Sequence, residues 1–215
     1  VFRTEQPVYV FPAAGSGGWE AALVNTLNPG DKVLSVSIGD FGERWFKVAN
    51  KLGLTVEKMR FEPGQAADPE KIAERLEQDR NKEIKAVLIQ HNETSTGVTN
   101  DVERIARVVR EHGAMIMVDA VSGLGALPLE FDKWDLDVVL TGAQKALMCP
   151  PGLSMVAFSE RARAASETNT MPRFYWDLKA VHNSYLKRQT PYTPSITLFY
   201  ALQAALQMIK EETLE

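Results

Sequence analysis

The sequence predicts an α/β protein that contains a mostly parallel sheet with helices on both faces. Short apolar runs alternate with longer helix-like stretches between residues 8 and 158. Several of these runs, such as residues 86–89, are apolar at every position. Continuous apolar strands are typical of parallel sheets that are buried on both sides, and the alternation with helices is typical of β-α-β units. At 215 residues the chain is long enough to bury a substantial core.

Turn and capping residues separate the expected helices. Asp68 is a suitable N-cap for one of them, with Pro69 at its first helical position. Gly53 and Gly113 are placed to end two others. Residues 161–193 are mixed and polar and show no clear periodicity. The expected helices are residues 19–27, 41–52, 69–78, 102–111 and 195–214.

The expected strands are apolar runs of four to six residues. The run at residues 54–59 alternates polar with apolar residues, as an exposed or edge strand does. The other runs are apolar at most positions, which is typical of buried strands. The expected strands are residues 8–11, 32–36, 54–59, 86–89, 114–118, 136–140 and 153–158.

Composition and charge argue against several classes of protein. The net charge is −4 and no basic stripe stands out, so a nucleic-acid-binding or anionic-membrane surface is not expected. No apolar run approaches membrane-spanning length. Cys149 is the single cysteine, which excludes an intrachain disulfide and fits a reducing compartment. The chain starts at Val1 and shows no signal peptide, so we expect an internal fragment or a trimmed chain.

Lys145 and Asp119 are the most informative residues. Lys145 follows the apolar run 136–140, and Asp119 follows the apolar run 114–118. The carboxyl edge of an open α/β sheet is where ligands bind, so both side chains are expected at that edge. A lysine for a Schiff base and an aspartate for a pyridinium nitrogen are the groups that pyridoxal phosphate requires from a protein. The alternative is that each residue lies in an ordinary surface turn.

A glycine-rich turn precedes the first expected helix. Gly15, Ser16 and Gly17 lie between a strand and the helix at residues 19–27. Glycines let backbone N–H groups approach an anion, and the helix N-terminus adds a partial positive charge. The spacing matches neither a dinucleotide fingerprint nor a P-loop. A compact phosphomonoester is therefore the expected anion, although many strand–helix turns use glycine for backbone reasons alone.

Other residues at the same edge have two interpretations each. Phe41 follows the strand at 32–36 and either stacks on a flat ring or fills the core at a helix start. Thr94 follows the strand at 86–89, and its hydroxyl either binds a ligand or belongs to an ordinary turn. No histidine has a metal-ligand spacing, so no metal site is expected. The tryptophans are interpreted as packing anchors, and they are Trp19, Trp45, Trp134 and Trp176.

Two segments resemble class V aminotransferases. Residues 141–152, with Gln144-Lys145 followed by two prolines and a glycine, are similar to the lysine segment of that family. Residues 118–126 resemble its aspartate segment. Residues 19–27, 174–177 and 189–195 are similar to the serine–glyoxylate and alanine–glyoxylate branch. The resemblance covers nearly the whole chain.

The resemblance implies a pyridoxal 5'-phosphate-dependent aminotransferase. Such an enzyme moves an amino group from serine or alanine to glyoxylate, giving glycine in a ping-pong reaction through pyridoxamine phosphate. It implies the fold type I large domain at residues 1–194, a helix at 195–215 leading toward a C-terminal small domain, and a homodimer with small-molecule substrates. The implied location is the cytoplasm or a peroxisome. The resemblance implies that Lys145 is the Schiff-base lysine and that Asp119 lies at the pyridine nitrogen. Val121 and Phe41 would lie on the ring faces, and Thr94 and Gln144 near the ring hydroxyl. The phosphate would be held by Gly15, Ser16 and Gly17, and Tyr192 or Thr193 would reach the neighbouring subunit's phosphate.

The sequence also departs from the family pattern and leaves alternatives open. Ala14 and Ser16 stand where the family's phosphate turn usually has serine and threonine. A ureidoglycine–glyoxylate aminotransferase or a cysteine desulfurase would share the fold, although Cys149 lies in the wrong loop for a desulfurase. A nucleotide-binding oxidoreductase is disfavoured because the Gly-x-Gly-x-x-Gly fingerprint is absent. A non-catalytic fragment is the remaining alternative.

Overall fold

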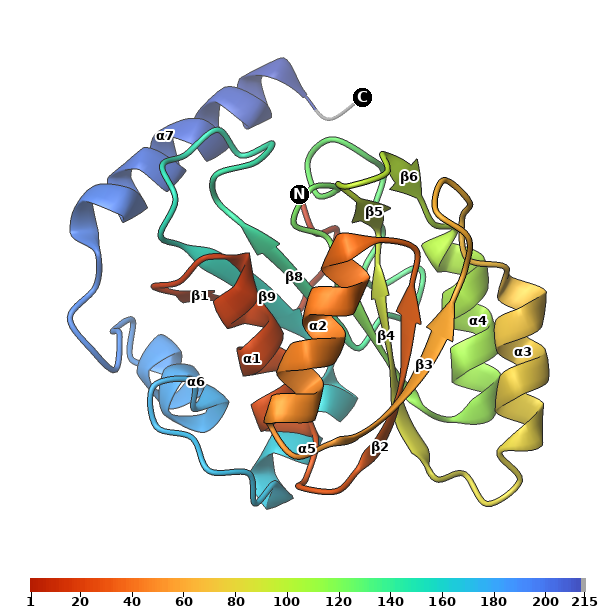
Figure 1. The fold of residues 1–215 in the computed structure, drawn as a ribbon. Coiled ribbons are helices and arrows are strands. Elements are labelled where there is room, and N and C mark those ends of the chain that lie inside the picture. Colours follow the sequence, from red (N-terminus) through yellow and green to blue (C-terminus); the bar gives the residue numbers. More distant parts are fainter. Residues whose placement is uncertain (214–215) are drawn as a thin grey trace.

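The structure is a seven-stranded sheet with helices on both faces, as Figure 1 shows. The computed structural model describes residues 1–213. The strands of this sheet are β1 (Val8–Phe11), β2 (Lys32–Ser37), β3 (Thr55–Arg60), β4 (Ile84–Gln90), β7 (Met115–Asp119), β8 (Val138–Gly142) and β9 (Ser154–Phe158). A separate two-stranded hairpin consists of β5 (Asn92–Glu93) and β6 (Val98–Thr99).

The sheet is mostly parallel, as predicted. The strand order is β1-β9-β8-β7-β4-β2-β3. The five strands from β8 to β3 run parallel to one another, whereas β9 is antiparallel to both of its neighbours, β8 and β1. The first strand of the chain therefore pairs with the last one, with Val8 opposite Ala157.

Two apolar cores lie on the two faces of the sheet. One contains buried side chains of α1 and α2, including Trp19 and Trp45, and the other contains buried side chains of α3, α4 and α7. Figure 1 shows α1 and α2 side by side over one face, and α3 and α4 side by side over the other. The helices are α1 (Gly15–Thr26), α2 (Asp40–Lys51), α3 (Pro69–Gln78), α4 (Val102–His112), α5 (Glu160–Thr168), α6 (Leu178–Leu186) and α7 (Ile196–Glu212).

The predicted helix ends are confirmed where they depended on caps. The Asp68 carboxylate accepts the N–H of Glu70 at 3.0 Å, with Pro69 at the first position of α3. Gly113 ends α4 with a φ of 96°, in the left-handed region that favours glycine. In the part of the chain that the structure describes, no helix is long and apolar enough to cross a membrane.

The structure differs from the sequence interpretation at two places. Residues 161–193, in which no clear periodicity was found, contain most of α5 and all of α6. These helices bury few and mostly small side chains, Ala162 and Ser166 in α5 and Leu178 in α6, so the apolar periodicity is weak. Helix α1 also begins at Gly15, four residues earlier than expected. Of the helix expected at 195–214, α7 covers Ile196–Glu212, and Leu214 lies outside the described residues.

Candidate active site

Asp119 and Lys145 lie at the carboxyl edge of two adjacent parallel strands. Asp119 is the last residue of β7 and pairs with Leu140 of β8, and Lys145 follows the end of β8. The turn that carries Lys145 is held by hydrogen bonds from the N–H of Ala143 to Leu153 O at 2.9 Å and from the N–H of Cys149 to Ala143 O at 3.0 Å. Lys145 is exposed, whereas Asp119 is only 4% exposed.

The buried Asp119 carboxylate accepts two hydrogen bonds. Trp19 Nε1 donates to Oδ2 at 2.9 Å, and the N–H of Val121 donates to Oδ1 at 2.8 Å. Burial raises the pKa of Asp119 from 3.8 to about 6, and the nearby Glu93 charge also raises it. The two hydrogen bonds and the Lys145 charge oppose that increase in pKa. Asp119 therefore favours a cationic partner, because a positive charge beside the carboxylate offsets the cost of its burial.

Trp19 has a polar role that the sequence interpretation missed. Its ring stacks on Trp45 at 6.2 Å and meets Phe41 edge-on at 6.3 Å, as a packing anchor does. Its indole N–H is also the donor to Asp119. The only sequence signal for this contact is the place of Trp19 in the first turns of a helix at the carboxyl edge.

The first turn of α1 has the features of an anion-binding turn. Its N-cap, Ala14, makes no side-chain hydrogen bond to the helix, so N–H groups of the first turn have no side-chain partner there. A Cβ on Gly15 would lie 2.6 Å from Val121 Cγ2, and a Cβ on Gly17 would lie 2.5 Å from Ala13 Cβ. Close packing therefore requires glycine at both positions. Ser16 between them is exposed.

Phe41 and Thr94 lie on two segments that one carboxylate joins. Glu93 Oε2 accepts the N–H of Phe41 at 3.0 Å, and Thr94 follows Glu93 in the β5–β6 turn. Phe41 is half-buried, with the Arg44 guanidinium carbon 5.0 Å from its ring centre, and Thr94 is exposed. Glu93 was not identified from the sequence.

Gln144 contributes an unpaired polar atom. Its Oε1 is buried and has no hydrogen-bond partner among the described residues. A buried amide oxygen without a donor is costly, so a bound group that donates a hydrogen bond would stabilise this position. Val121, the other predicted ring contact, is half-buried against the first turn of α1.

Among the described residues, Tyr192 and Thr193 make no hydrogen bond to the other predicted site residues. The Tyr192 hydroxyl donates to Phe174 O at 2.6 Å, and its ring stacks on Tyr175 at 4.7 Å. Tyr175 in turn meets Trp176, which lies against Gly17. Tyr192 is therefore two aromatic rings from the α1 turn. A cavity of about 370 Å³ lies beside this segment, and its lining includes neither Lys145 nor Asp119.

Together these residues define an α/β protein that presents a lysine, a buried carboxylate and a glycine-containing helix turn without a side-chain cap at one edge of its sheet. The model of the family described as aminotransferase class-V matches residues 8–215. The chain therefore belongs to the class V aminotransferase family, which confirms the resemblance and favours the aminotransferase interpretation over a nucleotide-binding oxidoreductase.

Relatives with different names match over the same span. A protein of Anabaena cylindrica named soluble hydrogenase 42 kDa subunit is 47% identical over 99% of this chain and 56% of its own length. The serine–glyoxylate aminotransferase of Arabidopsis thaliana is 42% identical over 100% of this chain and 55% of its own length. The crystal structure of an alanine–glyoxylate aminotransferase from Nostoc sp. superposes with a TM-score of 0.93 at 31% identity, covering 99% of this chain and 57% of that one. The chain thus spans about half the length of the relatives it matches.

Proposed function

We propose that this chain is the cofactor-binding part of a pyridoxal 5'-phosphate-dependent aminotransferase that acts on a small amino acid, serine or alanine, and on glyoxylate. The observation that carries the proposal is the placement of the buried Asp119 at the end of β7 and of Lys145 in the turn that follows the adjacent strand β8. Family membership supports the reaction class, and the names of the relatives support glyoxylate as the acceptor.

The described residues fit the proposed cofactor in three respects. The α1 turn at Gly15, Ser16 and Gly17 suits a phosphate, because its N–H groups lack a side-chain cap. The buried Asp119 carboxylate suits a protonated ring nitrogen. The unpaired Oε1 of Gln144 suits a ring hydroxyl. The remaining proposed contacts are Phe41 and Val121 at the ring faces and Thr94 near the hydroxyl.

The chain's own groups have separate tasks in the proposed reaction. Pyridoxal phosphate, when bound, supplies an electron sink for the bond that is broken at the substrate Cα. Asp119 favours the protonated form of the ring nitrogen by charge pairing. The Lys145 amine, after it is displaced by the substrate amine, would accept the proton from the substrate Cα as a general base and donate it as a general acid to the cofactor carbon that had been bonded to the lysine nitrogen.

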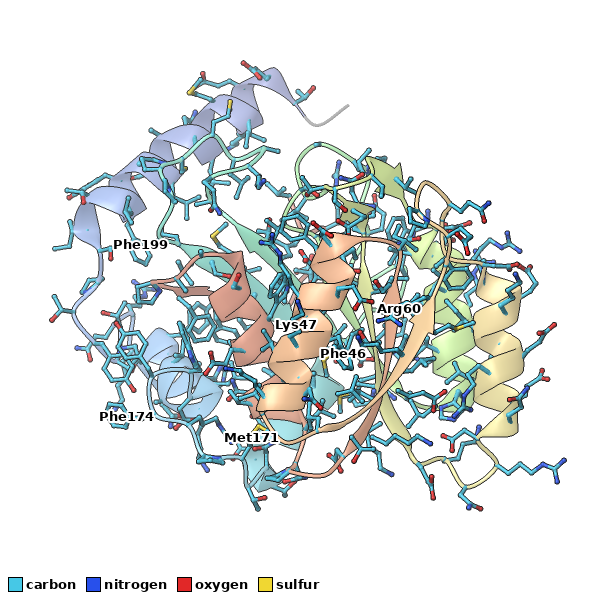
Figure 2. The ribbon with its side chains drawn as sticks, viewed as in Figure 1. Phe46, Lys47, Arg60, Met171, Phe174 and Phe199 are labelled. Atoms are coloured by element: carbon cyan, nitrogen blue, oxygen red, sulfur yellow. The ribbon has the colours of Figure 1, made fainter. Side chains whose placement is uncertain are left out.

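Reduction with borohydride tests the assignment of Lys145. The full-length protein is mixed with pyridoxal phosphate and reduced, and the labelled peptide is mapped by mass spectrometry. We expect the label on Lys145 and its loss in Lys145→Ala. Lys47, an exposed lysine on α2 that Figure 2 labels, is the matched control, because Lys47→Ala should leave labelling unchanged. A label that persists in Lys145→Ala contradicts the proposal.

We further propose that the functional protein is a homodimer in which Tyr192 or Thr193 reaches the phosphate of the neighbouring subunit. Exposed apolar side chains near this segment support the proposal, since a surface of this kind is typical of an interface. Figure 2 labels two of the aromatic residues in this region, Phe174 and Phe199. The most exposed apolar side chains there are Phe174 at 76%, Tyr200 at 68%, Leu186 at 66% and Ile196 at 58%.

The division of the chain and its location are also proposals. Residues 1–194 are proposed as most of the large domain, and 195–215 as the helix that leads toward a small domain. The cytoplasm or a peroxisome is the proposed location, because Cys149 is a free, buried cysteine that suits a reducing compartment. Fluorescence microscopy of the tagged full-length protein tests the location.

A further inference from the structure

Glu93 is a fully buried carboxylate that accepts four hydrogen bonds. It is 0% exposed. Its Oε2 accepts the N–H groups of Phe41 at 3.0 Å and Gly42 at 3.2 Å. Its Oε1 accepts the N–H of Ser95 at 3.0 Å and the Ser95 hydroxyl at 2.7 Å. The described residues give it no ion-pair partner, so these donors and the positive end of the α2 dipole balance its charge.

The carboxylate caps α2 from a distant part of the sequence. The N-cap residue of α2, Gly39, has no side chain to bond the first turn. A Cβ on Gly39 would lie 2.6 Å from Glu93 Cγ and 2.5 Å from Ser95 Oγ, so glycine is required for the carboxylate to approach. Ser95 Oγ also accepts the N–H of Asp40 at 3.0 Å. Glu93 and Ser95 thus supply the acceptors that a local N-cap residue normally supplies.

The same hydrogen bonds hold Phe41 and Thr94, two residues proposed to contact the cofactor, in fixed positions relative to each other. Phe41 lies in the first turn of α2 and is bound to Glu93 directly. Thr94 lies between Glu93 and Ser95, both of which are bound to that turn. The Glu93 charge also acts on Asp119, since it is one of the groups that raise the pKa of Asp119. Glu93 is therefore connected to three residues proposed to contact the cofactor. Phe41 is proposed at a face of the ring, Thr94 near the ring hydroxyl and Asp119 at the ring nitrogen.

We propose that Glu93 is a positioning residue of the cofactor site, holding Phe41 and the Thr94 turn in one fixed arrangement through a single buried carboxylate. The role toward the cofactor rests on the proposed function. The coupling of the two segments, however, is a property of the chain alone. A role limited to capping α2 and closing its own turn would stabilise those two segments without affecting the bound cofactor.

Four variants of the full-length protein separate these roles. Glu93→Ala removes all four bonds, and Glu93→Gln keeps the shape but replaces one acceptor oxygen with a donor. Ser95→Ala removes the hydroxyl bonds alone. Asp137→Asn is the control for general destabilisation. Asp137 is also 0% exposed and accepts a backbone N–H, that of Ile116 at 2.9 Å, but it is paired with Arg161 and precedes β8 at the opposite edge of the sheet.

The first measurement needs no cofactor. Hydrogen exchange followed by mass spectrometry reports on peptides covering residues 38–46 and 92–99. In Glu93→Gln and Glu93→Ala we expect both peptides to exchange about tenfold faster or more, because the lost bonds involve a charged acceptor. We expect Asp137→Asn to change neither peptide selectively. If only the 38–46 peptide responds, or neither does, the coupling is refuted.

The second measurement uses pyridoxal phosphate itself. Titration by absorbance and the visible circular dichroism of the bound cofactor report affinity and ring placement. We expect Glu93→Gln to weaken binding about tenfold and to alter the dichroism, Ser95→Ala to have a smaller effect, and Asp137→Asn to keep the wild-type band. Wild-type affinity and dichroism in Glu93→Gln would overturn the positioning role. Failure of the wild-type protein to bind pyridoxal phosphate would instead contradict the proposed function, and the exchange result would still decide the coupling.

Discussion

Trp19 Nε1 donates a hydrogen bond to Asp119 Oδ2 at 2.9 Å, which joins helix α1 to the end of strand β7. The helix that begins with the Gly15–Gly17 turn therefore also holds the buried carboxylate. A shift of α1 would move the proposed phosphate contacts and disturb Asp119 together. The hydrogen bond thus couples the position of the carboxylate to that of the turn, and fixed relative positions are what a cofactor site requires.

Trp19→Phe tests this link by keeping the ring and removing the donor. The pKa of Asp119 should rise above about 6, because the lost hydrogen bond opposes the effect of burial. A hydrogen bond to a charged group contributes about 1.5–3 kcal/mol, so we expect kcat to fall by about tenfold or more. The measurements are the pH dependence of stability of the cofactor-free protein, which reports the pKa, and kcat of the protein loaded with pyridoxal phosphate. Trp45→Phe is the control, since Trp45 Nε1 has no hydrogen-bond partner among the described residues. Equal effects of the two substitutions would contradict the link.

The pH dependence of stability tests the burial of Asp119. In the cofactor-free protein its pKa is about 6 against an ordinary 3.8, so the folded state binds more protons than the unfolded state between these values. As pH rises from about 4 to about 6, Asp119 therefore lowers the free energy of unfolding by about 3 kcal/mol. Below about pH 4 the carboxyl is protonated in both states and has no such effect. Asp119→Asn removes this dependence. Urea unfolding of both proteins at several pH values should show the difference between them changing across that window, and a constant difference would count against the raised pKa.

Gly17→Ala tests the packing of the α1 turn. The new Cβ would lie 2.5 Å from Ala13 Cβ and 3.1 Å from the Trp176 ring, so the turn must shift. We expect about 1–3 kcal/mol of destabilisation from overpacking, together with weaker binding of pyridoxal phosphate. Adding Ala13→Gly removes the closest contact and should restore part of both. The exposed Ser16 provides the control Ser16→Ala, which should leave stability unchanged. Lack of any rescue by Ala13→Gly would show that the clash is not the cause.

Mixed subunits test the proposed homodimer. A Lys145→Ala subunit is combined with a Tyr192→Phe/Thr193→Ala subunit under conditions that exchange subunits. In a shared-site dimer, half the molecules are mixed, and each mixed dimer has one site without either defect. About a quarter of wild-type activity should therefore return. Tyr192→Phe alone is the control. It removes the hydrogen bond to Phe174 O within the same chain, so it shows how much activity is lost through that bond without the Thr193 substitution. If no activity returns although mixed dimers are detected, the shared-site proposal is incorrect.

The sequence predicted well the features that depend on local patterns. Strands β7 and β8 are apolar along most of their length, so their ends could be located, and with them Asp119 and Lys145. Helix α6 was missed because Leu178 is its single buried residue, and one apolar side chain produces no periodicity. Trp19 and Glu93 could not be assigned from a single sequence. Their partners lie 100 and 52 residues away, and no local pattern records contacts at that distance.

The pairing of β1 with β9 affects how the chain is made. Val8 leaves the ribosome roughly 150 residues before its native neighbour Ala157, a delay of about 7–30 s at ordinary rates of synthesis. During that time β1 has no strand to pair with. Helix α1, which follows β1 directly, cannot yet pack against the completed sheet. Segments of this kind are the ones that chaperones capture and that aggregate when synthesis outpaces folding. The Gly15–Gly17 turn is thus translated before the strand that pairs with β1, and it can take its final position only after that strand has been made.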